Sequence, residues 1–256
     1  MNTLLLKAKV RAAAIHLTGC VVVGMTCWAL VRYLWYPVPL LELMGGGPLF
    51  VLLLLADVTL GPVLTLVAFN PSKPRHLLIL DYAIILGVQV FALVYGVHVL
   101  HSARPAFVVF AKDRFSVVRA SDLDASALAA ATVHEYRILQ HGGPRWVSLD
   151  ANLKDSEALK ITMAAAAGGV DIDHYPRYYR PLEEARTDIA KVAKPISEVW
   201  GPVVPAPITY FDASAGGGNT DLGVIPIVGR ARDAGLIVDR QSGAVLGYVD
   251  ADPWPK

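Results

Sequence analysis

Apolar residues are gathered in the N-terminal part of the chain, in three long runs. Residues 12–35, 49–69 and 77–100 are almost entirely hydrophobic. A helix of roughly 20 mainly apolar residues is needed to cross the hydrocarbon layer of a membrane. Each run reaches that length, so the pattern predicts a three-helix transmembrane bundle within residues 1–101.

Helix-breaking residues separate the three runs. The first run ends in an aromatic cluster that suits a membrane–water boundary, and Pro37, Pro39 and the glycines at 45–47 follow it. We expect this connection to contain no helix and to belong to the membrane domain. The second and third runs are joined by residues 70–76, a short segment with two prolines. So short a connection predicts an antiparallel helical hairpin.

The pattern changes after residue 102, where short strand signals begin. Residues 106–120 are rich in Val and Phe and alternate, which predicts one strand or a tight hairpin around Lys112 and Asp113. A further short strand is expected at residues 145–149. The C-terminal part predicts an antiparallel meander, because turn residues separate four more apolar runs: 208–211, 223–230, 235–239 and 244–250.

Helical signals lie between these strands. Ser121 and Asp122 are good N-caps for an alanine-rich helix that would extend to Gln140. Residues 155–168 predict a second alanine-rich helix, and residues 181–194 a third with proline in its first turn. Helices and strands together predict a single α+β domain with an antiparallel sheet over residues 102–256.

Composition and charge narrow the classes of function. Hydrophobic residues make up 54% of the chain, and the formal net charge is +1. No basic patch with interleaved aromatic residues occurs, which argues against a nucleic-acid partner. The two cysteines, Cys20 and Cys27, both lie in the first apolar run. A disulfide framework, a cysteine zinc site and a thiol nucleophile are therefore excluded from the domain.

Basic residues predict the orientation in the membrane, because short cytoplasmic segments are enriched in Lys and Arg. The N-terminal tail and the second connection hold most of them, whereas the first connection offers only Arg32. The residues concerned are Lys7, Lys9, Arg11, Lys73 and Arg75. We expect a multi-pass protein of the bacterial inner membrane with a cytoplasmic N-terminus and a periplasmic C-terminal domain. The first run ends in aromatic residues rather than a cleavage site, so we interpret it as a retained anchor.

Carboxylates within the apolar runs are the least expected residues. Asp57 lies near the middle of the second run, where a charge costs roughly 2.5–3.5 kcal/mol on insertion scales. Two interpretations stay open: a hydrogen bond to Gln89 that pins the bundle together, or a contact with a transmembrane helix of another protein. Asp81 lies about one turn inside the third run, where Arg75 or Lys73 is a possible ion-pair partner.

The C-terminal domain lacks the motifs of the common enzyme and metal sites. Two clusters hold histidines and carboxylates, at residues 134–141 and 171–174, but neither has the HExxH spacing. Ser148 and Asp150 are not accompanied by a GxSxG elbow, and no lysine follows the glycines at 216–218 as a phosphate loop requires. We therefore predict neither catalysis, metal nor cofactor. A protein interface is the preferred interpretation of an aromatic and basic run that contains Tyr175, Arg177, Tyr178 and Arg180.

Several short motifs occur in a fixed order along nearly the whole chain. They are Tyr36-Pro37 with Pro39-Leu40, Asp57-Val58-Thr59-Leu60-Gly61-Pro62, Asp81 with Gln89, Ala103-Arg104-Pro105, Pro176-Arg177-Tyr178-Tyr179 and Asp252-Pro253-Trp254. In this order they resemble the TfpX/TfpZ family of type IV pilin accessory proteins. The resemblance implies a non-enzymatic accessory or chaperone protein of the inner membrane that promotes the stability and assembly of a specific major pilin.

That resemblance also suggests where a pilin would bind. The bundle would hold the transmembrane helix of the pilin, with Asp57, Asp81 and Gln89 as candidate contacts. Small residues, namely Gly24, Gly61 and Gly87, would allow close approach. The periplasmic domain would hold the pilin head through the run at residues 175–180. A membrane-anchored sensor or ligand-binding module is the alternative, and it would require a deep domain pocket with convergent polar groups.

Overall fold

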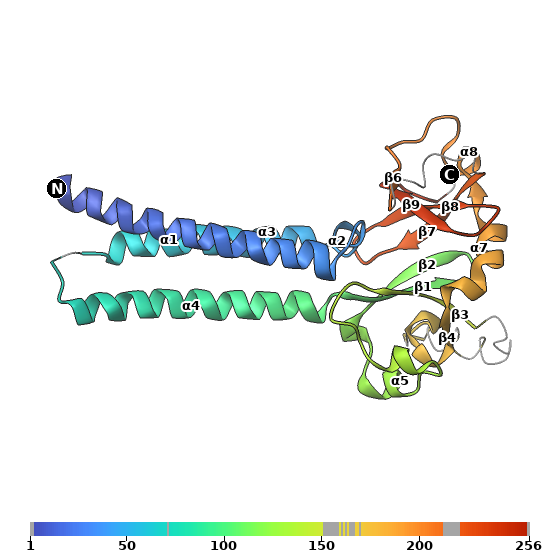
Figure 1. Cartoon of the computed structure of the whole chain (residues 1–256), viewed down its shortest axis with the longest axis horizontal. Helices are drawn as coiled ribbons and strands as arrows, with labels where there is room; N and C mark the ends of the chain where they lie inside the picture. The colour runs from blue at the N-terminus through green and yellow to red at the C-terminus, as the bar shows by residue number, and fades with distance from the viewer. Residues whose placement is uncertain are drawn as a thin grey trace. The chain divides into compact units, whose positions relative to one another are not determined.

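The computed structural model describes residues 3–70, 72–150, 159, 161, 163, 167–168, 170–211 and 221–254. It divides into two compact units (Figure 1). The first unit contains Met1–Leu34 and Gly46–Ser102, and the second contains Trp35–Gly45 and Ala103–Lys256.

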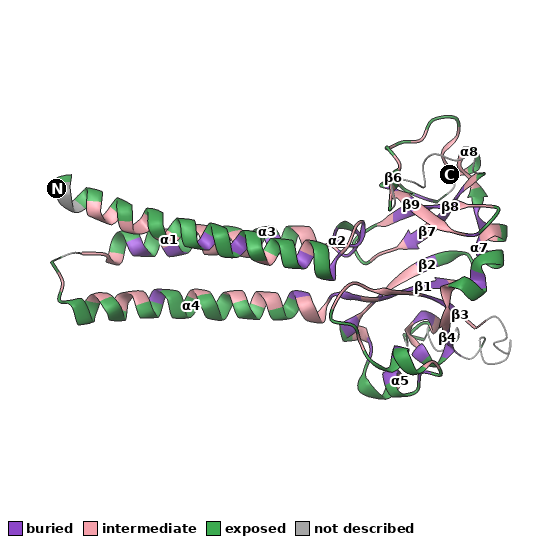
Figure 2. Ribbon diagram, in the orientation of Figure 1, coloured by how far each residue is buried: buried purple, intermediate pink, exposed green. Residues whose placement is uncertain are grey.

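The first unit consists of three long apolar helices, as the sequence predicts. Helix α1 (Thr3–Ala29) continues into a π-helical segment, η1 (Leu30–Trp35), and is followed by α3 (Gly46–Ala68) and α4 (Arg75–Ser102). All three are long and apolar enough to cross a membrane. Helix α3 carries the main helix–helix contacts, with α1 on one side and α4 on the other. Many of the large apolar side chains are exposed (Figure 2), which suits contact with lipid.

We expected the glycines at 45–47 to break any helix, but two of the three lie within one. Helix α3 already begins at Gly46, and only Gly45 has a positive φ, of 71°. The left-handed conformation at Gly45 is one that glycine adopts at little cost, so this residue alone makes the break. The connection also contains a short helix, α2 (Leu40–Leu43), where the two prolines led us to expect none.

The second unit is built around one mixed β-sheet. Its strands are β1 (Pro105–Ala111), β2 (Arg114–Arg119), β3 (Arg145–Leu149), β4 (Tyr179–Pro181), β5 (Lys194–Pro195), β6 (Thr209–Tyr210), β7 (Leu222–Val228), β8 (Asp233–Asp239) and β9 (Val245–Val249). The strand order is β4-β3-β1-β2-β7-β8-β9-β6, and β5 pairs with β7 off this path. The hairpin at Lys112 and the meander β7–β8–β9 are antiparallel as predicted.

We expected an antiparallel sheet, but two of the strand pairs are parallel. Strand β3 pairs with β1 and β7 pairs with β2 in parallel. Long connections precede both β3 and β7, and a parallel pair requires such a crossover. The sequence pattern identifies the longer strands but not the short β4 and β5, and it does not give the direction in which these connections return.

The predicted helix at residues 121–140 is wrong. The chain instead forms η2 (Ala120–Asp122), α5 (Ala125–Ala129) and η3 (His134–Arg137). Asp124 provides the cap, because its carboxylate accepts a hydrogen bond from Ala127 N at 2.7 Å. Burial of Ala131 and Tyr136 beneath the sheet then decides the local path against the helical preference of alanine.

The other helices of the domain are short. The predicted helix at residues 181–194 is observed as η6 (Leu182–Ala185) and α7 (Arg186–Val192). The remaining short helices are η4 (Ile172–His174), η5 (Pro176–Tyr178) and α8 (Ile196–Trp200). The predicted helix at 155–168 falls mainly outside the described residues, as do the glycines at 216–218.

The connection between α1 and α3 belongs to the core of the second unit. Leu40 and Leu43 are 1% and 0% exposed, and they share a hydrophobic cluster with Phe115 and Leu236 of the sheet. The backbone oxygen of Leu43 also accepts a hydrogen bond from Ala231 N at 2.9 Å. Our expectation was a loop of the membrane domain, whereas the contacts of this segment make it part of the second unit.

Candidate functional site

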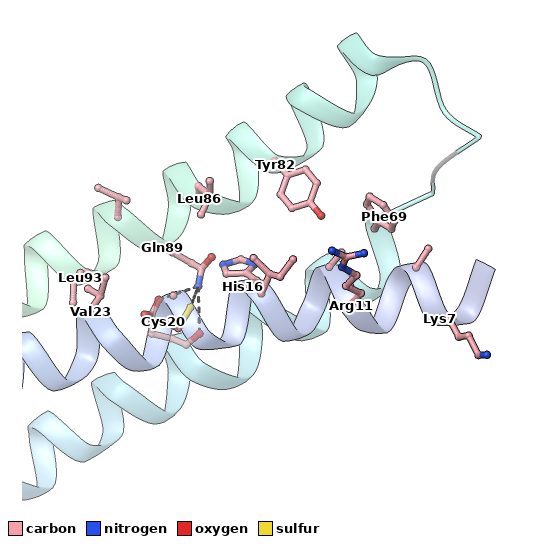
Figure 3. Close-up of a pocket in the computed structure, with 16 residues that line it drawn as sticks. Lys7, Arg11, His16, Cys20, Val23, Phe69, Tyr82, Leu86, Gln89 and Leu93 are labelled. Carbon is pink, nitrogen blue, oxygen red and sulfur yellow. Dashed lines mark hydrogen bonds between the residues drawn. The ribbon is translucent and has the colours of Figure 1, made fainter. Parts of the chain in front are cut away.

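A groove of about 880 Å³ lies along the helical unit (Figure 3). Most of its lining residues come from α1 and α4, which both pack on α3, and Asp57 of α3 also lines it. The lining residues are Lys7, Ala8, Arg11, Ala12, Ile15, His16, Gly19, Cys20, Val23, Asp57, Phe69, Tyr82, Leu86, Gln89, Val90 and Leu93.

A polar cluster lies in the middle of this groove. The side-chain nitrogen of Gln89 donates to the Asp57 carboxylate at 2.9 Å and approaches the Asp57 backbone oxygen at 3.3 Å. It also lies 3.5 Å from the Cys20 sulfur. Of the two interpretations of Asp57, the internal hydrogen bond is therefore formed, and the same pair faces the groove.

Glycine at position 61 makes this arrangement possible. A Cβ on Gly61 would overlap the carboxamide of Gln89, so a larger residue would displace that side chain from Asp57. Gly24 also lies in a packed contact within the unit, because a Cβ at this position would overlap the side chain of Leu54. Gly87, by contrast, has open space around it. Two of the three glycines that we considered for binding a partner helix thus serve contacts within the unit.

His16 occupies the same stretch of the groove, and its two ring nitrogens differ. Nδ1 lies 2.5 Å from the hydroxyl of the buried Thr65. Nε2 is buried and has no hydrogen-bond partner among the described residues, and the same holds for the side-chain oxygen of Gln89. Figure 3 shows both side chains on the groove, His16 from α1 and Gln89 from α4.

The ends of the groove differ in character. Lys7 and Arg11 line the end near the start of α1, and neither forms an ion pair with a described residue. Val23 and Leu93 line the far end. The groove is thus an elongated apolar surface with a basic end and a polar centre, which suits an elongated apolar partner better than a compact polar ligand.

Asp81 lies apart from this groove. Its carboxylate forms an ion pair with Lys73 at 2.7 Å, in the helical hairpin of α3 and α4. This is one of the local pairings that the sequence suggested. Asp81 is not among the residues that line the groove, so the structure does not bring it together with Asp57 and Gln89.

The aromatic and basic run of the domain does not form one uniform surface. The Arg177 guanidinium lies over the rings of Tyr178 and Tyr175, 4.6 and 5.4 Å from their centroids, while Tyr178 itself is buried. Arg180 instead forms an ion pair with Asp150 at 2.5 Å. Tyr175 and Arg177 therefore present a cation–aromatic pair at the surface, and Arg180 belongs to a neighbouring hollow.

That hollow measures about 960 Å³ and carries side chains of both charges. Six of its charged side chains form three ion pairs: Arg180 with Asp150, Lys191 with Asp188 at 3.2 Å, and Arg114 with Asp113 at 3.1 Å. Among the described residues, no group of three or more His, Cys, Asp and Glu could hold a metal ion. Ser148 is buried and donates to the Pro181 backbone oxygen at 3.1 Å, so it is no nucleophile poised beside a base.

Next to the hollow, a histidine sits in a network of carboxylates. His174 Nδ1 lies 2.6 Å from Asp173, and its Nε2 lies 3.9 Å from Asp122. The hydrogen bond to Asp173 raises the pKa of His174 above its ordinary value, against the effect of burial. Burial opposes ionisation of Asp122, but hydrogen bonds and charge from Arg119, 2.5 Å away, hold the pKa of that carboxyl below its usual range. The network fixes η4 to the sheet.

A sequence pattern for one wall of the groove is present in and just before the first apolar run, but the high hydrophobicity of that run makes it hard to recognise. Small and polar residues recur on α1 at helical spacing, and they form one stripe of the wall: Lys7, Ala8, Arg11, Ala12, His16, Gly19 and Cys20. Only the position of α4 across from α1 turns this stripe into one side of a groove.

Comparisons with known proteins agree on one family. The family model described as "Fimbrial assembly protein FimB" matches residues 5–45, which cover most of α1 and the connection that follows. The "Fimbrial assembly protein, serogroup I" of Dichelobacter nodosus is 31% identical over 188 residues, 73% of this chain and 72% of that relative. The serogroup E1 protein of the same organism is 30% identical over the same shares of the two chains. No solved structure matches the chain. The extent and identity of these matches place the chain in the FimB family of fimbrial assembly proteins.

Proposed function

We propose that this protein is a non-enzymatic accessory factor of type IV fimbrial biogenesis, of the TfpX/TfpZ kind, that binds a specific major pilin in the bacterial inner membrane. It would stabilise the pilin and promote its assembly into the fibre. Membership in a family of fimbrial assembly proteins supports a role in fimbrial biogenesis. The groove between α1 and α4 is the observation that carries the binding step.

The dimensions of the groove suit a transmembrane helix. It extends along α1 from Lys7 to Val23, about 24 Å at the helical rise of 1.5 Å per residue. This length approaches the thickness of the hydrocarbon layer, about 30 Å. Small residues of the α1 wall, such as Ala12 and Gly19, would let the backbone of a second helix come close. Asp57 and Gln89 would lie at the level of its middle.

The extramembrane unit would hold the pilin head. We place this contact on the cation–aromatic pair of Arg177 with Tyr175, supported by Tyr178, with Arg180 nearby. Such a contact requires the domain to face the periplasm, in keeping with the orientation expected from the basic residues. Asp81 is assigned to the α3–α4 hairpin instead of the pilin, because it pairs with Lys73.

Filling the groove tests the proposal. Gly19 lines the groove and has nothing within 4 Å of its Cβ position, so Gly19→Leu adds a side chain without an internal clash. The full-length variant, purified in detergent from cells that make the pilin, should recover at least about tenfold less pilin than the wild type, a loss of about 1.4 kcal/mol in binding.

Gly87→Leu is the matched control. Gly87 is also surrounded by open space, but it does not line the groove. This variant should recover pilin as the wild type does, and both variants should be equally abundant in the membrane. Undiminished recovery with Gly19→Leu would show that the pilin does not occupy the groove.

A further inference from the structure

Two buried polar atoms on the groove wall have no partner among the described residues. They are Nε2 of His16 and the side-chain oxygen of Gln89. Both residues line the groove, and both side chains extend toward it in Figure 3. In the hydrocarbon region no water is available to satisfy such atoms, so leaving them unpaired costs free energy. A ligand that supplies the missing hydrogen bonds would therefore be favoured.

The chemistry of that ligand follows from what each residue already binds. The nitrogen of Gln89 is engaged by Asp57 at 2.9 Å, so the oxygen of the same carboxamide needs a donor. Nδ1 of His16 is engaged by Thr65 at 2.5 Å, which leaves Nε2 as the free position of the ring. A hydroxyl or a carboxamide can both donate and accept, and so can serve both atoms. A carboxylate cannot donate to Gln89, and a lipid acyl chain can serve neither atom.

We infer that the helix bound in the groove carries a Ser, Thr, Asn or Gln side chain that pairs with His16 and Gln89. This inference rests on the proposed function, because it takes the groove to be the site of a pilin helix. His16 lies about 13 Å along α1 from Lys7, at the helical rise of 1.5 Å per residue. The polar side chain of the partner therefore lies well inside its apolar segment, away from the membrane boundary.

A double-mutant cycle between the two proteins tests the inference. Each Ser, Thr, Asn and Gln in the apolar helix of the co-purifying pilin is replaced by Ala, Val or Leu of similar size. Recovery is measured with the full-length wild type and with His16→Phe, which keeps a flat ring and removes both nitrogens. One pilin position should lower recovery about tenfold with the wild type and cause little further loss with His16→Phe.

Disulfide trapping gives a second measurement that does not depend on how much pilin is recovered, because the covalent link also captures a weakened complex. Cys20 lines the groove next to Gln89, whereas Cys27 does not line it. A cysteine at the coupled pilin position should form a disulfide-linked heterodimer on oxidation in membranes. The product should disappear with Cys20→Ser and persist with Cys27→Ser.

The outcomes separate this inference from the proposed function. If Gly19→Leu abolishes pilin recovery but no hydroxyl or carboxamide position couples to His16 or cross-links to Cys20, the groove holds the pilin and the inference is wrong. If Gly19→Leu recovers pilin normally, the groove itself is not the binding site.

Discussion

At the scale of single residues, a few polar side chains make the specific contacts within each unit. In the helical unit, the Asp57–Gln89 hydrogen bond was foreseeable by counting depth along two apolar runs, because a carboxylate in lipid demands a partner. His16 was not foreseeable in the same way, since its surroundings depend on where α4 lies. In the domain, contacts with Asp173 and Asp122 raise the pKa of His174.

The stability of the domain should therefore depend on the protonation of His174. Its pKa in the folded state is raised, with the hydrogen bond to Asp173 as the largest cause. The stabilisation is then fully present below the ordinary histidine pKa of about 6.5 and is lost as pH rises through the higher folded value. His174→Gln should lower the free energy of unfolding by about 1–2 kcal/mol at low pH, with a smaller difference at alkaline pH.

Thermal unfolding of the full-length protein in detergent, measured across this pH range, gives the comparison. His134→Gln is the control, because His134 is exposed and belongs to no ion pair among the described residues. If the difference in unfolding temperature between His174→Gln and the wild type grows as pH rises, protonated His174 does not stabilise the domain.

At the scale of elements, hydrophobic periodicity predicted the helices and strands whose formation depends on their own local sequence. The three apolar helices, the hairpin at Lys112 and the C-terminal meander follow from runs and alternation that each element contains within itself. The helix expected at 121–140 failed because burial of Tyr136 against Phe107 outweighs alanine's helical preference. The role of residues 35–45 was missed because the prolines were weighed more heavily than the apolar residues at 40, 41, 43 and 44.

This connection should be essential to the domain although it precedes α3. Leu43 is fully buried in the core cluster, so Leu43→Ala should cost the extramembrane unit about 2–5 kcal/mol, the usual range for a buried leucine. Leu34→Ala is the matched control, since Leu34 is 48% exposed and lies outside that unit. Limited proteolysis of the full-length variants should show faster cleavage of residues 103–256 only for Leu43→Ala. Equal protection of the two variants would mean that the connection is not part of the fold.

At the scale of the whole molecule, the fold of the second unit constrains how the chain crosses the membrane. Residues 35–45 follow the first helix and residues 103–256 follow the third, yet both belong to one hydrophobic core. We therefore expect them to lie on the same side of the membrane that the apolar helices would cross. A chain in which all three helices cross satisfies this condition, because the segment after the first crossing and the segment after the third emerge on the same side.

The basic residues then decide which side that is. Lys7, Lys9 and Arg11 precede the first helix, and Lys73 lies in the loop that would share their compartment. We expect alkaline phosphatase, which is active only in the periplasm, to be active when fused at the C-terminus and inactive when fused at Ser72. A fluorescent protein that matures only in the cytoplasm should give the opposite pattern. Phosphatase activity at Ser72 alone would place the domain in the cytoplasm, where no contact with a pilin head is possible.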